Sequence, residues 1–309
     1  MANPNNRCFL CGEKRLEVVK GYSWLVECHN CGLVYNPELK NDPWEVSQLF
    51  YDDVNMEYRK KIQSVLLKIS HYRWNWLIQR MGADTGSLLE VGCGTGEFLT
   101  TARLAGWEVC GLELSKSFRS AALSWYDLEL QGTELGQAGF GVNSFDAVIL
   151  FHVFEHLQDP FEFLSQVSHI LKSGGCLFMI VPNLSSWTDN LFGKSNPTLI
   201  KKDHYFHYSP ATLQKMVSQN SFDIVEVVTH EPSHHLWTSI YGFLALRIKP
   251  LRRVSNQADK SQGASSTSKT ISILPYHLGS LSSICLFPFR FWLQKTNRGH
   301  EIYFLCRRR

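Results

Sequence analysis

The stretch Leu88 to Gly96, which reads L-L-E-V-G-C-G-T-G, constrains the fold of this chain more than any other segment. Its first residues form a short apolar run bounded by turn residues, as a buried parallel strand does. Three glycines follow at alternate positions, where a side chain would block the approach of a ligand to the backbone. The next residues place apolar side chains at helical spacing and stop at Gly106. The segment therefore predicts a unit of strand, glycine-rich loop and helix.

The spacing of these glycines distinguishes between the known types of nucleotide-binding loop. A dinucleotide fingerprint, G-x-G-x-x-G, would need a glycine where Glu97 stands, and a phosphate-binding Walker loop would need a lysine in this stretch. What remains is the pattern E-x-G-x-G-x-G, followed by a second acidic residue, Glu113, at the end of the next apolar run. A carboxylate there can accept hydrogen bonds from both hydroxyls of a ribose. The stretch therefore resembles motif I of the class I S-adenosylmethionine-dependent methyltransferases.

Strands and helices alternate along the chain after this unit. Apolar runs end at Glu113, Phe151 and Pro182, and two later runs, F-D-I-V-E-V-V and E-I-Y-F-L-C, predict further strands. Such alternation is typical of an α/β, doubly wound parallel sheet. The resemblance implies a seven-stranded Rossmann-like methyltransferase sheet, with a weak third strand before Gly132 and an antiparallel last strand beside strand six.

The segment after the fourth strand carries the residues best placed for catalysis. It runs from His152 to Pro160 and resembles the H-x-x-E-H-x-x-D-P segment of small-molecule methyltransferases of quinone biosynthesis and sugar modification. Ligands of open α/β sheets bind beyond the carboxyl ends of the strands, so these side chains are expected to face the reaction centre. We predict that His152 or His156 removes the acceptor proton and that Glu155 orients one of them. Alternatively, the histidines only brace the loop.

The same resemblance implies the other residues of the site. Thr133 and Glu134 stand where the family's turn after strand three reaches the adenine, although the usual aspartate is absent. His204, with His207 and Tyr208 close by in sequence, stands at the mouth of the acceptor pocket. The residues expected to bind S-adenosylmethionine are Glu90, Gly92, Cys93, Gly94, Gly96, Glu113, Leu114, Thr133, Glu134 and Phe151.

Two cysteine pairs near the N-terminus predict a metal site. Cys8-x-x-Cys11 and Cys28-x-x-Cys31 are separated by sixteen residues, a spacing typical of four-cysteine zinc sites. Four thiolates leave no open coordination position, so the predicted Zn²⁺ is structural. A redox dithiol and plain structural thiols are the alternatives.

These patterns divide the chain into five parts. We predict a zinc-ribbon-like module over 1–36, a linker and amphipathic helix over 37–84, the S-adenosylmethionine-binding core over 85–235, an apolar helical insertion over 236–295 with a disordered loop at 253–270, and the final strand over 296–309. Prolines and charges interrupt the insertion, which argues against a transmembrane helix. It could be a lid, additional core, or, over 236–293, a peripheral membrane contact.

The sequence thus predicts an enzyme that transfers a methyl group to an oxygen, or less readily a carbon, of a small, sugar-linked or lipid-linked acceptor. The net charge of +3 gives no strong signal for a nucleic-acid partner. The alternatives are an RNA or protein methyltransferase that docks its substrate on the zinc module, and a non-catalytic cofactor-binding scaffold. Paired cysteines and the lack of an apolar leader favour a cytoplasmic location, with peripheral contact at the inner face of the membrane as an option.

Overall fold

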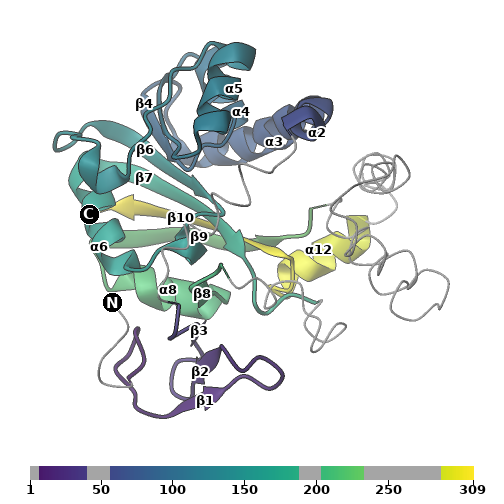
Figure 1. The fold of residues 1–309 in the computed structure, drawn as a ribbon, viewed down its shortest axis with the longest axis vertical. Helices are drawn as coiled ribbons and strands as arrows, with labels where there is room; N and C mark the ends of the chain where they lie inside the picture. Colours follow the sequence, from purple (N-terminus) through teal and green to yellow (C-terminus); the bar gives the residue numbers. More distant parts are fainter. Residues whose placement is uncertain (1–6, 40–55, 188–202, 233–286) are drawn as a thin grey trace.

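The computed structural model describes residues 7–39, 56–187, 203–232 and 287–309. A six-stranded mixed sheet in the order β5-β4-β6-β7-β10-β9 forms its centre (Figure 1). The strands are β4 (Ser87–Val91), β5 (Glu108–Leu112), β6 (Phe145–Phe151), β7 (Leu171–Pro182), β9 (Phe222–His230) and β10 (Glu301–Arg308). β10 lies between β7 and β9 and is antiparallel to both, whereas the other pairs are parallel. The predicted Rossmann-like fold and the place of its last strand are confirmed.

The predicted third strand is the one departure from the expected seven-stranded sheet. Before Gly132, a single parallel bridge between Leu112 and Gln131 takes its place. Two backbone hydrogen bonds join this segment to β5, from Gln131 N to Gly111 O at 2.9 Å and from Glu113 N to Gln131 O at 3.0 Å. The described part of the chain therefore has six strands in this sheet.

Helices cover both faces of the sheet (Figure 1). One face carries α3 (Gln63–Met81), α4 (Glu97–Leu104) and α5 (Lys116–Tyr126), and the other carries α6 (Pro160–Ile170) and α8 (Pro210–Ser218). Side chains alternate along a strand, so Val148 and Leu150 of β6 join one apolar cluster while Ala147 and Ile149 join the other. The carboxyl ends of the parallel strands are left open between these layers, where ligands of such sheets bind.

The helices begin and end at residues suited to those positions. Ser115 caps α5 by accepting a hydrogen bond from Phe118 N, and Ser209 forms a capping box with Thr212 at the start of α8. Gly82, in the left-handed conformation, ends α3. The amphipathic helix predicted within 37–84 is broken at Ile62 into α2 (Met56–Lys61) and α3.

The N-terminal residues form a second, small sheet that includes a strand from the core. Its order is β1 (Leu16–Val18), β2 (Val26–Cys28), β3 (Val34–Tyr35) and β8 (Phe206–His207). β3 pairs antiparallel with β8, so that Val34 lies opposite His207. Phe9 also packs against Phe161 and Phe206, with ring centroids 5.5 and 5.1 Å apart. The cysteine-bearing segment is therefore joined to the segment that carries the predicted acceptor-site histidines.

The apolar insertion predicted over 236–295 is described only in part. α12 (Phe287–Lys295) is the helix that the structure describes at its end. The disordered loop at 253–270 and most of the membrane contact over 236–293 lie outside the described residues. In the part of the chain that the structure describes, no helix has the length and apolar character needed to cross a bilayer.

Candidate active site

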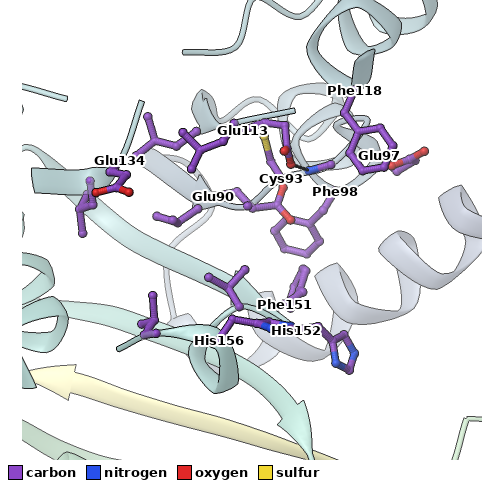
Figure 2. Close-up of a pocket in the computed structure, with 18 of the residues that line it drawn as sticks. Glu90, Cys93, Glu97, Phe98, Glu113, Phe118, Glu134, Phe151, His152 and His156 are labelled. Atoms are coloured by element: carbon purple, nitrogen blue, oxygen red, sulfur yellow. Dashed lines mark hydrogen bonds between the residues drawn. The ribbon is translucent and has the colours of Figure 1, made fainter. Parts of the chain in front are cut away.

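A cavity of about 690 Å³ opens at the carboxyl ends of β4, β5 and β6. Its size lies within the range of about 300 to 1,000 Å³ that is usual for small-molecule sites. Figure 2 shows Cys93 and Glu113 on one side of it and His152 and His156 on the other, with Phe98 and Phe151 between them. The cavity therefore joins the predicted cofactor loop to the predicted catalytic segment.

The three loop glycines all have left-handed backbone but face different neighbours. Gly92 and Gly94 line the cavity with φ of +70° and +57°, conformations that most side chains avoid. A Cβ on Gly92 would stand 2.5 Å from Val153, and one on Gly94 would stand 3.0 Å from the Arg59 guanidinium. Gly96, predicted to bind the cofactor, does not line the cavity, and a Cβ there would meet Leu128 at 2.7 Å. Close packing against Leu128 at the start of α4 therefore explains why position 96 is a glycine.

Two buried carboxylates, Glu90 and Glu113, line the part of the cavity that is expected to hold the cofactor. Glu113 accepts hydrogen bonds from Gly94 N at 2.7 Å and from Ser115 N at 2.8 Å, one on each oxygen. Each oxygen keeps a second lone pair, so the carboxylate can still accept the two hydroxyls of a ribose. The other carboxylate, Glu90, has one oxygen without a hydrogen-bond partner among the described residues. Burial raises the pKa of Glu113, and it raises the pKa of Glu90 well above its usual range.

The remaining predicted cofactor residues all line the same cavity. They are Cys93, Leu114, Thr133, Glu134 and Phe151. Phe151 meets Phe98 edge-on at a centroid distance of 4.9 Å, and Glu134 stands just before the short helix η1 (Leu135–Gln137). The structure thus brings together nine of the ten residues predicted to bind the cofactor, the exception being Gly96.

His152 is held between two buried carboxylates. Its Nε2 lies 3.1 Å from Oε1 of Glu301, and its Nδ1 lies 3.6 Å from Oε1 of Glu155. Burial would lower the pKa of His152, but the contacts with Glu155 and Glu301 outweigh burial and raise that pKa to about 9. At neutral pH the ring is therefore a cation with both N–H groups directed at carboxylates, and it has no lone pair for accepting a proton.

The ring nitrogens of His156 have different neighbours from those of His152. Its Nδ1 lies 3.0 Å from the backbone oxygen of Asp203, and its side chain lines the cavity. A carbonyl oxygen can only accept, so in neutral His156 the proton is on Nδ1 and the lone pair on Nε2. The ring meets His204 edge-on at a centroid distance of 4.6 Å. Of the two histidines predicted as the base, His156 is therefore the one whose neutral ring keeps a lone pair, on Nε2.

Glu155 and His204 lie behind the cavity wall rather than in it. Both are buried, and neither lines the cavity. One carboxylate oxygen of Glu155 and one ring nitrogen each of His156 and His204 lie within 4.8 Å of one another. Burial would raise the pKa of Glu155, but His152, His156 and His204 lower that pKa to about 2. Glu155 is therefore an ionised group that faces the histidines from within the protein.

Several residues of the site were not predicted from the sequence. Arg59 and Arg73, from α2 and α3, line the cavity, and Glu301 at the start of β10 contacts His152. Arg59 donates from Nε to Thr95 Oγ1 at 2.8 Å and lies 3.6 Å from Glu97. The arginines belong to the polar positions of an amphipathic pattern, where charged residues are usual, and no local motif singles them out.

We expect the His152 ring to titrate near pH 9. The folded-state pKa exceeds the unfolded value of about 6.5, so His152 stabilises the fold fully below about pH 6.5, and this contribution is lost as the pH rises through 9. NMR spectra of ¹⁵N-histidine-labelled protein, with His152→Gln to assign the signal, measure the midpoint. A midpoint near 6.5 would contradict the arrangement described above.

The four N-terminal cysteines form a compact cluster. Sγ of Cys8 lies 3.5 Å from Sγ of Cys31, and Sγ of Cys11 lies 3.5 Å from Sγ of Cys28. Tetrahedral Zn²⁺ with bonds of about 2.3 Å would separate its sulfur ligands by about 3.8 Å. Tight turns hold each pair, with Gly12 N donating to Cys8 O and Gly32 N to Cys28 O. The cluster therefore has the residues and the spacing that a structural zinc ion needs.

Comparison with known proteins identifies the class of protein to which this chain belongs. Residues 59–227 match the family model described as a methyltransferase domain. The chain is 31% identical over 106 residues to the ubiquinone biosynthesis O-methyltransferase of Caulobacter vibrioides, covering 31% of this chain and 41% of that protein. It is 26% identical over 176 residues to the protein of that name from Vibrio parahaemolyticus, covering 52% of this chain and 74% of that protein.

The solved structures agree on the fold. A SAM-dependent methyltransferase from Archaeoglobus fulgidus superposes with a TM-score of 0.52 at 17% identity, covering 83% of this chain and all of that one. The fold of the chain is that of a class I methyltransferase. The chain belongs to the methyltransferase-domain family and is an enzyme that uses S-adenosylmethionine.

Proposed function

We propose that this enzyme transfers the methyl group of S-adenosylmethionine to an oxygen of a small, sugar-linked or lipid-linked acceptor, with carbon as the less favoured atom. The observation that carries the proposal is the position of the His156 side chain at the cavity wall, opposite the glycine loop, with Nδ1 held by the backbone oxygen of Asp203. The relatives named O-methyltransferases support oxygen as the acceptor atom. Their match covers part of each chain, so the acceptor is inferred from the site.

Bound S-adenosylmethionine supplies a methyl group that its sulfonium already activates. The protein then has to align the acceptor with that methyl group and take up the acceptor's proton. With the cofactor bound and supplying the methyl group, His156 would accept the proton of the acceptor at Nε2. The resulting imidazolium donates from Nδ1 to Asp203 and faces the ionised Glu155, which stabilises its charge.

The cofactor side fits S-adenosylmethionine by its charges. Glu90 and Glu113 present carboxyl oxygens to a ligand that carries an ammonium, a sulfonium and ribose hydroxyls besides its carboxylate, and the glycines leave the backbone accessible. The partner-free oxygen of Glu90 is satisfied when a donor or cation of the ligand reaches it. These observations support the predicted roles of both carboxylates.

Zinc and location are further parts of the proposal. We infer one structural Zn²⁺ on Cys8, Cys11, Cys28 and Cys31, supported by the sulfur distances. The division of the chain at residue 36, the cytoplasmic location and a peripheral membrane contact stay predictions from the sequence.

We expect Glu113→Ala to weaken S-adenosylmethionine binding by about 1.5 to 3 kcal/mol, or about 10- to 150-fold, because two ribose hydroxyls lose a charged acceptor. Gly94→Val should weaken it as well, because the new side chain enters the cavity and displaces Arg59. Isothermal titration calorimetry with S-adenosylmethionine measures both effects.

Gly139→Val is the matched control for the glycine variant. Gly139 also has positive φ, at +71°, but lies outside the cavity with no atom near its would-be Cβ. It therefore reproduces the backbone strain of the substitution without filling the site. Unchanged affinity in both Glu113→Ala and Gly94→Val would refute the proposed cofactor site.

A further inference from the structure

His152 lines the cavity, but it has no part in the proton transfer described above. It lies on the same side of the cavity as His156 (Figure 2), and one buried carboxylate is close to both rings. Oε1 of Glu155 lies 3.6 Å from Nδ1 of His152, and a carboxylate oxygen of Glu155 lies within 4.8 Å of a ring nitrogen of His156. Glu155 is therefore shared between a histidine that is protonated at neutral pH and the proposed base.

The backbone at His152 has a conformation that side chains seldom adopt. Its φ is +56°, in the left-handed region, and its N–H donates to the backbone oxygen of Ile180 at 2.8 Å. In this conformation the ring reaches Glu301, which lies opposite Pro182 at the end of β7. Strained residues of this kind persist where their neighbours hold them in place, and they are concentrated at functional sites. The strain indicates that the ring is needed between its two carboxylates.

The charges of this group balance only while His152 carries its proton. Burial opposes the charges on His152 and Glu155, but their contact holds the pKa of His152 at about 9 and that of Glu155 at about 2. Glu301 adds a second negative charge, and Arg73, 3.5 Å from Glu301, adds a second positive one. With a neutral His152, the group would have a net negative charge inside the protein, which is costly. Glu155 would then favour a proton on His156.

The other charged groups of the cavity lie on the cofactor side. They are Glu90, Glu113, Glu134, and the pair of Arg59 and Glu97, whose charged atoms are 3.6 Å apart. Arg73 faces this side too, because Glu90 is among the groups that support its charge, and its guanidinium is available to the carboxylate of the cofactor. The charge balance around His152 therefore has to be measured with the cofactor site filled.

We propose that His152, fixed by Glu301, is a positioning residue whose positive charge occupies Glu155 and so leaves His156 unprotonated, ready to take the proton of the acceptor. This inference deepens the proposed function and rests on it. A general base works best when it neither holds a proton before the reaction nor lacks a counter-charge afterwards. Glu155, already paired with His152, meets both conditions for His156.

The test is an NMR titration of full-length, ¹⁵N-histidine-labelled protein saturated with S-adenosylhomocysteine, which carries the same carboxylate and ammonium as the cofactor. His156→Gln identifies the signals of His156. In His152→Gln, the pH at which His156 protonates should rise by about one unit or more above that of the wild type, the scale for losing a nearby unit charge at an effective dielectric constant of about 20. An unchanged midpoint would overturn the proposal.

Two further variants separate charge from structure. His152→Arg keeps a cation between the two carboxylates, so the midpoint of His156 should stay near that of the wild type. In the double variant His152→Gln/Glu155→Gln, the rise should disappear, because the carboxylate released by the first change has gone. The other groups that face His156 are Asp203 and His204, from the segment before β8, and they are the same in all of these proteins.

His230→Gln is the matched control. His230 lies directly opposite Glu301 in the pairing of β9 with β10, so both side chains are on one face of the sheet. Burial lowers the pKa of His230 to about 4, so the ring is neutral at neutral pH, and it does not line the cavity. This variant disturbs the packing around Glu301 without changing the charge. A rise of the His156 midpoint equal to that in His152→Gln would assign the effect to packing and overturn the proposal.

The wild type alone provides a second measurement, which does not depend on how the variants fold. The signals of His156 should change a second time, by a smaller amount, near pH 9, where His152 loses its proton. Their absence of response at that pH would refute the link between the two histidines and leave the methyltransferase function intact. Failure of the wild type to bind S-adenosylhomocysteine at all would refute the proposed function itself.

Discussion

Cys28→Ser is expected to remove about one equivalent of zinc and to disturb the acceptor side of the site before the cofactor side. A structural Zn²⁺ contributes on the order of 10 kcal/mol to the folding of a small domain, so a three-cysteine site should lose the metal and the order around it. Cys28 closes β2, and β2 pairs with β3. Loss of the metal therefore loosens the strand that pairs with β8.

The coupling to the acceptor side runs through β8 and its flanks. Asn36 N donates to Tyr205 O, and Tyr205 N donates to Glu155 O, both at 2.9 Å. His204 and His207 bracket this contact in the sequence, and His204 meets the His156 ring. In contrast, the glycine loop and Glu113 make their contacts within the parallel half of the sheet. Zinc loss should therefore change the surroundings of His156 while the cofactor loop keeps its shape.

Elemental analysis of protein purified without chelator measures the metal, thermal melting measures stability, and calorimetry measures S-adenosylmethionine binding. Cys110→Ser is the control, because Cys110 is a partly buried thiol on β5, outside the cluster. We expect one zinc per wild-type and Cys110→Ser chain, and a lower melting temperature only for Cys28→Ser. Metal-free wild-type protein that melts at the same temperature as Cys28→Ser would show that the cysteine pairs serve another purpose.

The parts of the site that could be predicted are those encoded in short segments. The glycine loop, Glu113 and the histidines after β6 each follow directly from a strand, and the ends of parallel strands meet at one edge of the sheet. A local pattern is then enough to place a side chain. The same local reasoning overestimated the third strand, because L-E-L-Q-G has the alternation of a strand but ends at Gly132 after one bridge to β5.

The parts that could not be predicted depend on contacts distant in sequence. Glu301 reaches His152 because the register of β10 sets it opposite Pro182, at the carboxyl end of β7. Nothing in the sequence near Glu301 indicates that register. The choice between His152 and His156 as the base depended on it as well, because Glu155 and Glu301 together raise the pKa of His152 to about 9. Arg73 is similar, because only the packing of α3 against the sheet directs its guanidinium toward Phe151 and Glu301.

Replacing His156 by alanine is expected to lower the methylation rate by about 10² to 10⁴ while leaving S-adenosylhomocysteine affinity within a few-fold. Proton removal by a positioned histidine contributes mainly to the transition state, so its loss should appear in kcat rather than in cofactor binding. The acceptor is first identified by comparing the metabolites of cells with and without the gene. The methylation rate is then measured with that acceptor as the formation of S-adenosylhomocysteine. Added imidazole should restore part of the activity, because a free base can occupy the vacated space.

If His156 only braces the loop, a different set of results is expected. A histidine that only supports the loop through its bond to Asp203 would, when removed, lower the melting temperature and weaken cofactor binding together. Imidazole would then restore little activity. His169→Ala, at an exposed position near the end of α6, controls for the loss of a histidine as such. If His156→Ala keeps near-normal turnover and stability, the base must come from elsewhere at the acceptor side, and His204, which packs against the His156 ring, is the residue to replace next.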